Sequence, residues 1–223
     1  MSDWLPMEEA QSKLQIKSIL ELLGDSQKSV IDVGCGDGRI LLPLTVAGHR
    51  VTGIDINPHA ISSCSIKLAK ACLDATLIDG DVLDVISDCE RADAIVICGQ
   101  TLMLFADIED AIELLSSCRE RLSENGIIII DDLPNDLWGE LTKGRWMEGI
   151  NEEGTMQLIW AKDDACFAIR EGEAVQSNQW KLTEQDKPLR LWTMGSLRLI
   201  AKCTALSAPE VQTEGAVLIM RSS

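Results

Sequence analysis

Short apolar segments, separated by stretches with helical character, recur along the first 130 residues and constrain the fold more than any other feature. Five of these segments are predicted to be strands: residues 28–33, 50–55, 75–79, 94–98 and 127–130. The fourth is apolar on both faces, which is typical of a strand inside a covered parallel sheet. Strands that alternate with helices, joined by right-handed crossovers, predict a doubly wound α/β fold with a mostly parallel sheet.

Helices are predicted between these strands from apolar periodicity and from capping residues. They cover residues 7–24 with a stop at Gly24, residues 37–47 with a kink at Pro43, a stretch from Asn57-Pro58 toward Ala71, and residues 107–122. In the last of these, Asp107 can cap the start, and Asn125-Gly126 marks the turn that follows.

The alternation breaks after Asp132. Residues 133–190 are rich in Gly, Trp and charge, and two short apolar runs, 156–161 and 165–170, are joined by a predicted turn. We therefore expect a small antiparallel excursion near the C-terminal part, too short to hold a core of its own. A last helix over 191–203 and a closing edge strand over 216–220 are predicted to complete a single domain spanning residues 1–223.

Composition limits the partners. The chain has 20 basic and 36 acidic residues, a net charge of −16, so we expect neither nucleic acid nor a membrane as a partner. Apolar runs are too short to span a bilayer, and the acidic first residues do not resemble a signal peptide. No two of the eight cysteines are closer than eight residues, which indicates buried free thiols in a cytoplasmic protein rather than a metal site.

The loop after the first strand, residues 32–39, lies where an open α/β sheet binds its ligand. Three alternating glycines, Gly34, Gly36 and Gly38, allow a tight turn and a close approach of backbone to a ligand. The N–H groups at the start of the next helix suit a carboxylate or a phosphate. A glycine-rich turn without any ligand is the alternative, and the glycine pattern alone leaves it open.

Two further acids follow the next two strands. Asp55 ends the second strand, where a carboxylate can accept hydrogen bonds from both hydroxyls of a ribose. Asp81 and Val82 follow the third strand, where they could bind the exocyclic amine of a base and pack against its ring. Either acid could instead be a turn or capping residue. Three such features at successive strand ends favour a nucleoside-containing ligand.

Together, residues 31–39, 51–56 and 80–82 resemble the class I S-adenosylmethionine-dependent methyltransferases. The resemblance implies a seven-stranded Rossmann-like sheet with an antiparallel last strand, and S-adenosylmethionine as cofactor, with S-adenosylhomocysteine as product. It divides the domain into an N-terminal helical cap (1–27), a cofactor-binding core (28–132), an acceptor-side lid or insertion (133–190), and a closing helix with edge strands (191–223).

The resemblance also implies roles for individual residues. Asp32 and the loop Gly34, Cys35, Gly36 and Gly38 would face the methionine part, and Asp55 would hold the ribose. The remaining cofactor contacts would be Ile56 beside the adenine, Asp81 and Val82 reading it, and Cys98 and Gly99 near the sulfonium.

Two other functions remain open. A dinucleotide-binding oxidoreductase of the NAD type needs a third glycine at position 39, where this chain has Arg39, and a pyrophosphate would be repelled by Asp32. A non-catalytic module that binds S-adenosylmethionine would carry the same motifs. We expect methyl transfer to the oxygen or nitrogen of a small molecule.

The acceptor side carries weaker indications. Residues 98–103 lack the Asn/Asp-Pro-Pro-aromatic signature of enzymes that methylate amide or adenine nitrogens. Candidate acceptor contacts are Gln100, Asp131, Trp138 and Trp146, whereas Trp160 is expected to be internal packing. No catalytic residue is assigned, because an activated sulfonium needs mainly alignment and desolvation.

Overall fold

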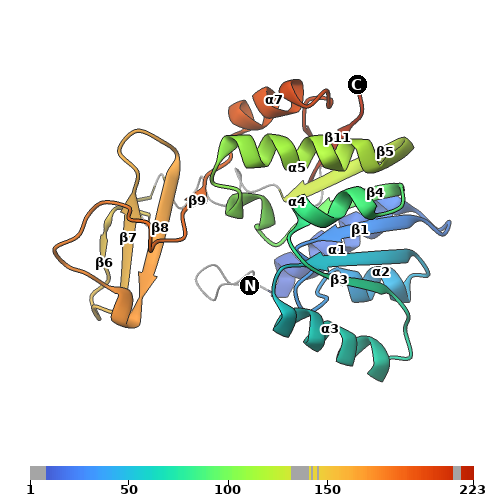
Figure 1. The fold of residues 1–223 in the computed structure, drawn as a ribbon, viewed down its shortest axis with the longest axis horizontal. Helices are drawn as coiled ribbons and strands as arrows, with labels where there is room; N and C mark the ends of the chain where they lie inside the picture. The colour runs from blue at the N-terminus through green and yellow to red at the C-terminus, as the bar shows by residue number, and fades with distance from the viewer. Residues whose placement is uncertain (1–8, 132–140, 142, 145, 213–216) are drawn as a thin grey trace.

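The computed structural model describes residues 9–131, 141, 143–144, 146–212 and 217–223, and its centre is a seven-stranded sheet (Figure 1). The strand order is β10-β11-β5-β4-β1-β2-β3. The bounds are β1 Ser29–Val33, β2 Arg50–Asp55, β3 Thr76–Asp79, β4 Ala92–Ile97, β5 Leu122–Asp131, β10 Glu210–Val211 and β11 Val217–Arg221. Strands β1 to β5 pair in parallel and β11 pairs antiparallel with β5, so the predicted sheet is confirmed.

Helices cover both faces of this sheet (Figure 1). The bounds are α1 Glu9–Leu23, α2 Leu41–Val46, α3 Pro58–Lys70, α4 Val82–Val85, α5 Ile108–Arg121 and α7 Met194–Cys203, with short 3-10 helices η1 Ile86–Asp88, η2 Thr101–Leu104 and η3 Gly172–Ala174. Helices α1, α2 and α3 bury their apolar residues in a cluster on one face, and α4, α5 and α7 in a second cluster on the other. Each face is therefore removed from water, as the apolar strands require.

Capping explains where two of the helices begin. The Asn57 side chain accepts hydrogen bonds from the backbone N–H groups of His59 and Ala60 at the start of α3. The Asp107 side chain accepts from the N–H of Glu109 and starts α5, as predicted. Asn125, in the predicted turn after α5, has φ +65° although it lies within β5. The strand registry shifts at this point, so the turn is a local irregularity in a longer strand.

The helix predicted over residues 37–47 is shorter than expected. Only Leu41–Val46 is helical, because Asp37 to Ile40 form turns that continue the glycine loop. Pro43 lies in the first turn of α2, where no backbone N–H is needed, so the predicted kink does not occur.

Two predictions for the C-terminal part differ from the structure, one in the start of a helix and one in the place of a strand in the sheet. Helix α7 begins at Met194 rather than at residue 191, because the Thr193 side chain caps it through the N–H of Ser196. Strand β11 is not the edge strand, since the two-residue strand β10 pairs with its outer side.

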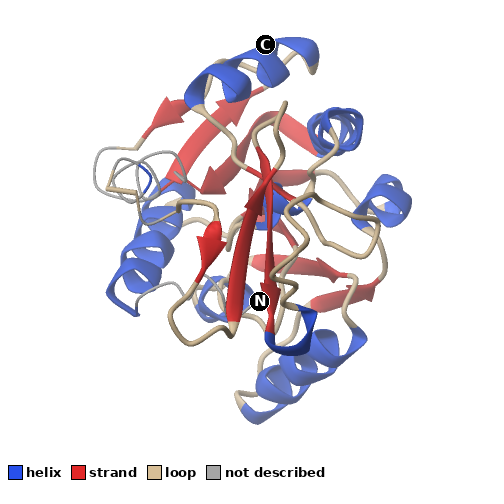
Figure 2. Cartoon of the chain, turned by 90° about the vertical axis from the view of Figure 1, so that its left-hand side faces the viewer, coloured by secondary structure: helices blue, strands red, loops and turns tan. Residues whose placement is uncertain are grey.

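The excursion after β5 forms a four-stranded antiparallel sheet, which lies to the left in Figure 1 and faces the viewer in Figure 2. Its strands are β6 Gly149–Ile150, β7 Met156–Trp160, β8 Cys166–Glu171 and β9 Leu189–Arg190. The predicted hairpin between the two apolar runs is confirmed by the pairing of β7 with β8. Phe167 and Leu158 of this sheet belong to the apolar cluster of the larger sheet, so the two sheets share a core.

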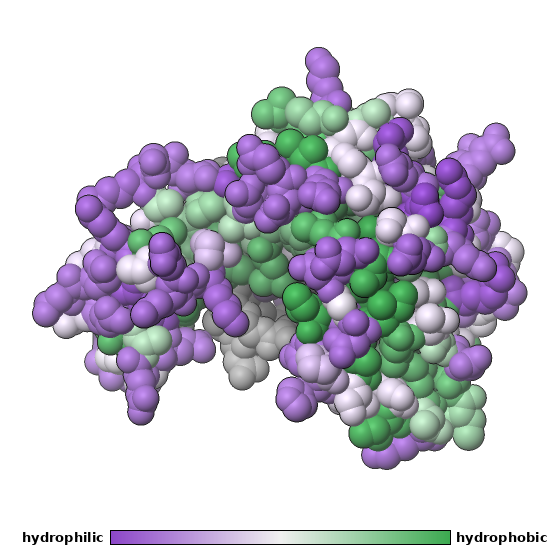
Figure 3. All heavy atoms as spheres, in the orientation of Figure 1, coloured by the Kyte–Doolittle hydropathy of each residue, from purple (hydrophilic) through white to green (hydrophobic). Residues whose placement is uncertain are grey.

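The surface of the four-stranded sheet is mainly hydrophilic in the view of Figure 3, which agrees with the acidic composition. Among the described residues, no helix combines the length and the apolar character needed to cross a bilayer.

Candidate functional site: a pocket at the carboxyl ends of the strands

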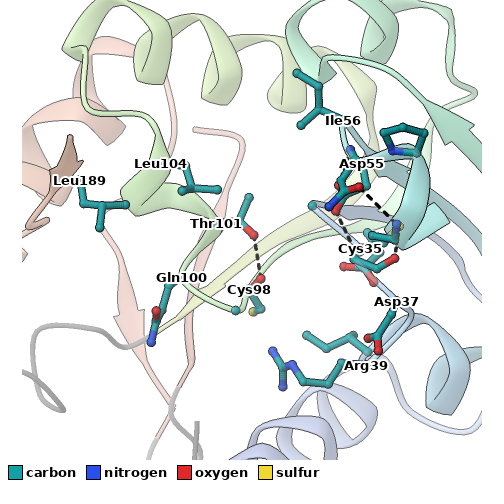
Figure 4. A pocket seen from close by; sticks show the side chains of 18 of the residues that line it. Cys35, Asp37, Arg39, Asp55, Ile56, Cys98, Gln100, Thr101, Leu104 and Leu189 are labelled. Carbon is teal, nitrogen blue, oxygen red and sulfur yellow. Dashed lines mark hydrogen bonds between the residues drawn. The ribbon is translucent and has the colours of Figure 1, made fainter. Parts of the chain in front are cut away.

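A cavity of about 890 Å³ opens at the carboxyl ends of β1, β2 and β4 (Figure 4). This volume lies within the range of roughly 300–1,000 Å³ that is usual for small-molecule sites. Nine of the predicted site residues line it: Asp32, Gly34, Cys35, Gly36, Asp55, Ile56, Cys98, Gly99 and Gln100. The carboxyl ends of three strands thus bring residues from distant parts of the sequence to one site.

The glycine loop needs its glycines for two different reasons. Gly34 has φ +69°, and a β-carbon there would lie 2.6 Å from Thr101 Oγ1, so a side chain would collide with η2. Gly36 has φ +56°, but a β-carbon there would meet no atom within 4 Å. Since Gly36 lines the cavity, its missing side chain leaves room for a ligand rather than for the protein itself.

Gly38 does not line the cavity. A β-carbon at this position would lie 2.0 Å from Leu42 Cδ1 and 2.7 Å from Cys64 Sγ. This glycine therefore permits close packing between the loop and helices α2 and α3.

Asp55 ties the end of β2 to the glycine loop. Its Oδ2 accepts a hydrogen bond of 2.7 Å from the backbone N–H of Gly36, and its Oδ1 accepts one of 2.8 Å from that of Asn57. Each carboxylate oxygen can accept a further hydrogen bond, so Asp55 can still bind a pair of hydroxyls. Figure 4 shows Asp55 and Ile56 at one side of the cavity, opposite Gln100 and Leu189.

Asp32 is buried at the end of β1, and its Oδ2 has no hydrogen-bond partner among the described residues. Burial raises the pKa of this carboxyl from 3.8 to about 7, and the nearby Arg39 guanidinium opposes the shift. A buried acceptor without a partner is rare, and this one lines the cavity, so it fits a cationic or hydrogen-bond-donating ligand group.

A tight turn after β4 forms one wall of the cavity. Gly99 and Gln100 have φ values of +79° and +66°, and the backbone N–H of Gln100 donates a 2.5 Å hydrogen bond to Asp131 Oδ2. Asp131 is buried and also accepts a hydrogen bond from Gln15 of α1. Desolvation raises its pKa, while the N–H groups of Gln100 and Gly99 and the charge of Arg39 oppose the shift. The Asp131 carboxylate therefore stabilises the turn at Gly99 and Gln100 through hydrogen bonding.

Arg39 lines the cavity between the loop and α1. Its Nη1 donates to Ser12 Oγ at 3.2 Å and its Nη2 to Gln15 Oε1 at 2.7 Å. Sequence reasoning treated Arg39 only as the residue that breaks a dinucleotide fingerprint. In the structure, the charge of its guanidinium opposes the rise that burial causes in the pKa of Asp32 and of Asp131.

The two cysteines of the cavity are poor nucleophiles. Burial is the largest cause that raises the pKa of both Cys35 and Cys98, and neighbouring carboxylates, Asp32 and Asp131 respectively, add to it. Because the thiolate is the reactive form, neither residue suits covalent chemistry.

Several predicted contacts do not reach the cavity. Asp81 caps α4 by accepting from the N–H of Leu83, and Val82 is buried against the core. Trp146 packs edge-on against Phe167, with ring centroids 5.5 Å apart, and its carbonyl accepts from Trp160 Nε1. Neither these residues nor Asp131 line the cavity, so the structure gives no support to their predicted ligand roles. Trp138 lies outside the described residues.

Sequence reasoning also missed part of the lining. Besides Arg39, the missed residues are Asp37, Ile40, Asn57, Pro58, Ala60, Thr101, Leu104, Lys187 and Leu189. Those near the glycine loop, Asp55 and Gly99 could have been found from their adjacency to predicted contacts. Lys187 and Leu189 come from the excursion, and no motif marks them.

Comparisons with known proteins agree with this geometry. Residues 30–126 match a family model described as a methyltransferase domain. The chain is 26% identical over 133 residues to the ubiquinone biosynthesis O-methyltransferase of Nitrosomonas europaea, covering 59% of this chain and 55% of that protein. It spans about half the length of the curated relatives that it matches, from 41% to 59%.

Solved structures share the fold along the whole chain. The CcbJ methyltransferase from Streptomyces caelestis superposes with a TM-score of 0.68 at 15% identity, covering 100% of both chains. The glycopeptide N-methyltransferase MtfA, solved in complex with S-adenosylmethionine, superposes with a TM-score of 0.59 at 14% identity, covering 99% of this chain and 97% of that one. The four-stranded sheet is thus included in the alignments.

Proposed function

We propose that the protein transfers a methyl group from S-adenosylmethionine to an oxygen or nitrogen of a small molecule, because residues 30–126 match the methyltransferase domain model. The observation that carries the proposal is one cavity that joins an unpartnered buried carboxylate, an open glycine and the Asp55 carboxylate.

The residues of the cavity fit this cofactor. The free Oδ2 of Asp32 matches a cationic α-ammonium group, and the space beside Gly36 admits a ligand without collision. Asp55 has acceptor capacity left for the two ribose hydroxyls. Ile56 is 68% exposed and lines the cavity, so a flat apolar group such as adenine could bury its surface.

When bound, S-adenosylmethionine supplies a methyl group that its sulfonium has already activated. The task left to the protein is therefore to align the acceptor and to exclude water from it. The turn at Gly99 and Gln100 is well suited to this task, because Asp131 fixes its backbone from the neighbouring strand. Cys98 stays protonated by virtue of its burial, so it would not compete for the methyl group.

The proposal is tested by incubating the protein with S-adenosylmethionine and a panel of small phenols, hydroxy acids and amines, and by measuring S-adenosylhomocysteine release. Release that depends on one acceptor and is lost in Gly36→Val supports methyl transfer. Binding of S-adenosylhomocysteine without release on any acceptor would instead favour a non-catalytic binding module. Binding of NAD in its place would favour an oxidoreductase.

A further inference from the structure

The acceptor end of the cavity is walled by apolar and amide groups, together with one lysine. Figure 4 shows Gln100, Leu104 and Leu189 on the side away from Asp55. Leu104 is 64% exposed and lines the cavity, so an apolar part of a ligand could pack against it. The lysine is Lys187, which lines the same cavity and precedes Leu189 by two residues.

Two ion pairs fix the short segment that carries Lys187. On its N-terminal side, Arg170 donates from Nε and Nη2 to the two oxygens of Asp186, each at 2.7 Å, and both side chains are only 5% exposed. Such a bidentate, buried pair restrains the backbone next to Lys187 strongly. The backbone carbonyls of Gln179 and Lys181 also accept from Arg170, so the loop before Asp186 is held as well.

The second ion pair lies on the C-terminal side of Lys187 and joins Arg190 to Asp164. Arg190 donates from Nη1 and Nη2 to Asp164 at 2.8 and 2.6 Å, and from Nε to the carbonyl of Ala106 at 2.6 Å. Ala106 follows η2, so this contact fixes β9 against the wall that carries Leu104. Lys187 itself makes no hydrogen bond and no ion pair within the described part of the chain.

The charges of the cavity are separated. Its acids lie at the cofactor end, where Asp37 pairs with Lys67 at 2.5 Å and Asp55 holds two backbone N–H groups. Asp32 lines the cavity from β1, two residues before Gly34. No carboxylate among the described lining residues comes from η2 or β9, so Lys187 has no competing acid on its own wall.

From this arrangement we infer that the acceptor is a small molecule with an apolar body and an anionic group, and that Lys187 binds the anionic group. The inference rests on the proposed function. The apolar body would pack against Leu104 and Leu189, and the anionic group would lie beside Lys187, in the segment between Asp186 and Arg190. Carboxylate and phosphate share the required chemistry, and the experiment distinguishes them.

The test is a ligand-observed NMR titration with three probes of similar shape: benzoate, phenyl phosphate and neutral benzamide. Each is titrated into the protein saturated with S-adenosylhomocysteine, and again without it, so that the lysine is tested even if the cofactor does not bind. The variants are Lys187→Gln, Lys187→Arg and the control Lys181→Gln. Lys181 is an exposed lysine of the same segment whose side chain does not line the cavity.

We expect at least one anionic probe to bind more tightly than benzamide. Lys187→Gln should weaken that probe by about fivefold, the limit for a single partly exposed ion pair, and should leave benzamide unchanged. Lys187→Arg should retain most of the affinity, and Lys181→Gln all of it. Which anion binds more tightly identifies the carboxylate or the phosphate class.

The inference is overturned if benzamide binds as well as both anions, if neither anion binds, or if Lys187→Gln binds them like the wild type. Titration of S-adenosylhomocysteine alone into each variant separates this failure from that of the proposed function. Because Lys187 is exposed and makes no contact to the core, its variants should keep the wild-type Tm.

Discussion

The carboxylate of Asp55 accepts a 2.7 Å hydrogen bond from the backbone N–H of Gly36, nineteen residues earlier in the chain. This contact joins the end of β2 to the glycine loop after β1. One side chain therefore shapes the loop and also presents its remaining acceptor capacity to the cavity.

Replacing Asp55 by Ala should weaken S-adenosylhomocysteine through both roles. Each charge-assisted hydrogen bond to a ribose hydroxyl is worth about 1.5–3 kcal/mol at most, so the loss should exceed tenfold in Kd by calorimetry. Asp79→Ala is the matched control, because Asp79 is the register partner of Asp55 on β3 and does not line the cavity. An unchanged Kd for S-adenosylhomocysteine in Asp55→Ala would show that Asp55 only stabilises the turn and does not bind the ribose.

Gly36→Val should abolish cofactor binding but leave a folded protein, because the new side chain would occupy ligand space. Gly172→Val gives an unusually close control. Both glycines have φ +56° and both lack any atom within 4 Å of an added β-carbon, but Gly172 lies in η3, away from the cavity. The two variants should lose similar stability through backbone strain, and only Gly36→Val should lose affinity. Equal affinities in the two would contradict the site.

Asp32→Asn should stabilise the fold and weaken the cofactor. The folded pKa of Asp32 is about 7 against 3.8 unfolded, so the unfolded chain loses its proton first as pH rises. As the pH rises from 3.8 to about 7, the contribution of this carboxyl to the free energy of unfolding of the wild type therefore decreases. Compared with wild type, Asn should be more stable by up to about 4 kcal/mol at pH 8, with the difference vanishing near pH 4. Denaturant titrations at both pH values, with S-adenosylhomocysteine binding measured in parallel, check this; a gain independent of pH would contradict it.

Trp146→Ala should act on stability rather than on the acceptor. The ring packs against Phe167 and belongs to the margin of the apolar cluster, so we expect a loss of about 1–3 kcal/mol, below that of a fully buried Trp. Trp180→Ala, which removes a half-buried ring bonded only to Ser177 among the contacts described, should cost less. If Trp146→Ala instead kept the wild-type stability but had a strongly reduced rate per acceptor concentration, Trp146 would be a contact of the acceptor.

The part of the cavity that holds Asp32, Asp55 and Gly99 was predictable, because each of these residues lies at or just after the end of a strand. The strand ends at Asp32 and Asp55 and the turn at Gly99 follow from alternation and from the rule that ligands bind at carboxyl ends. Asp81 shows the limit of this reasoning. The same residue type at the next strand end serves as a helix cap, and spacing alone does not distinguish the two uses.

The acceptor half was not predictable, because it depends on pairing between distant segments. Lys187 lines the cavity from a segment that is held by the ion pairs of Arg170 with Asp186 and of Arg190 with Asp164 and by the pairing of β9 with β8. The surroundings of Asp131 also depend on distant segments. Asp131 is the last residue of β5, and its side chain accepts hydrogen bonds from the N–H of Gln100 and from Gln15, which are far apart in sequence.

The most direct test of the account is a crystal structure of the protein with S-adenosylhomocysteine. The account predicts the ligand in the cavity at the carboxyl ends of β1, β2 and β4, with its ribose hydroxyls on Asp55, its ammonium on Asp32 Oδ2, its adenine over Ile56, and its sulfur near Gly99 and open toward Lys187. A ligand bound elsewhere, or one whose ribose and ammonium groups avoid Asp55 and Asp32, would contradict it.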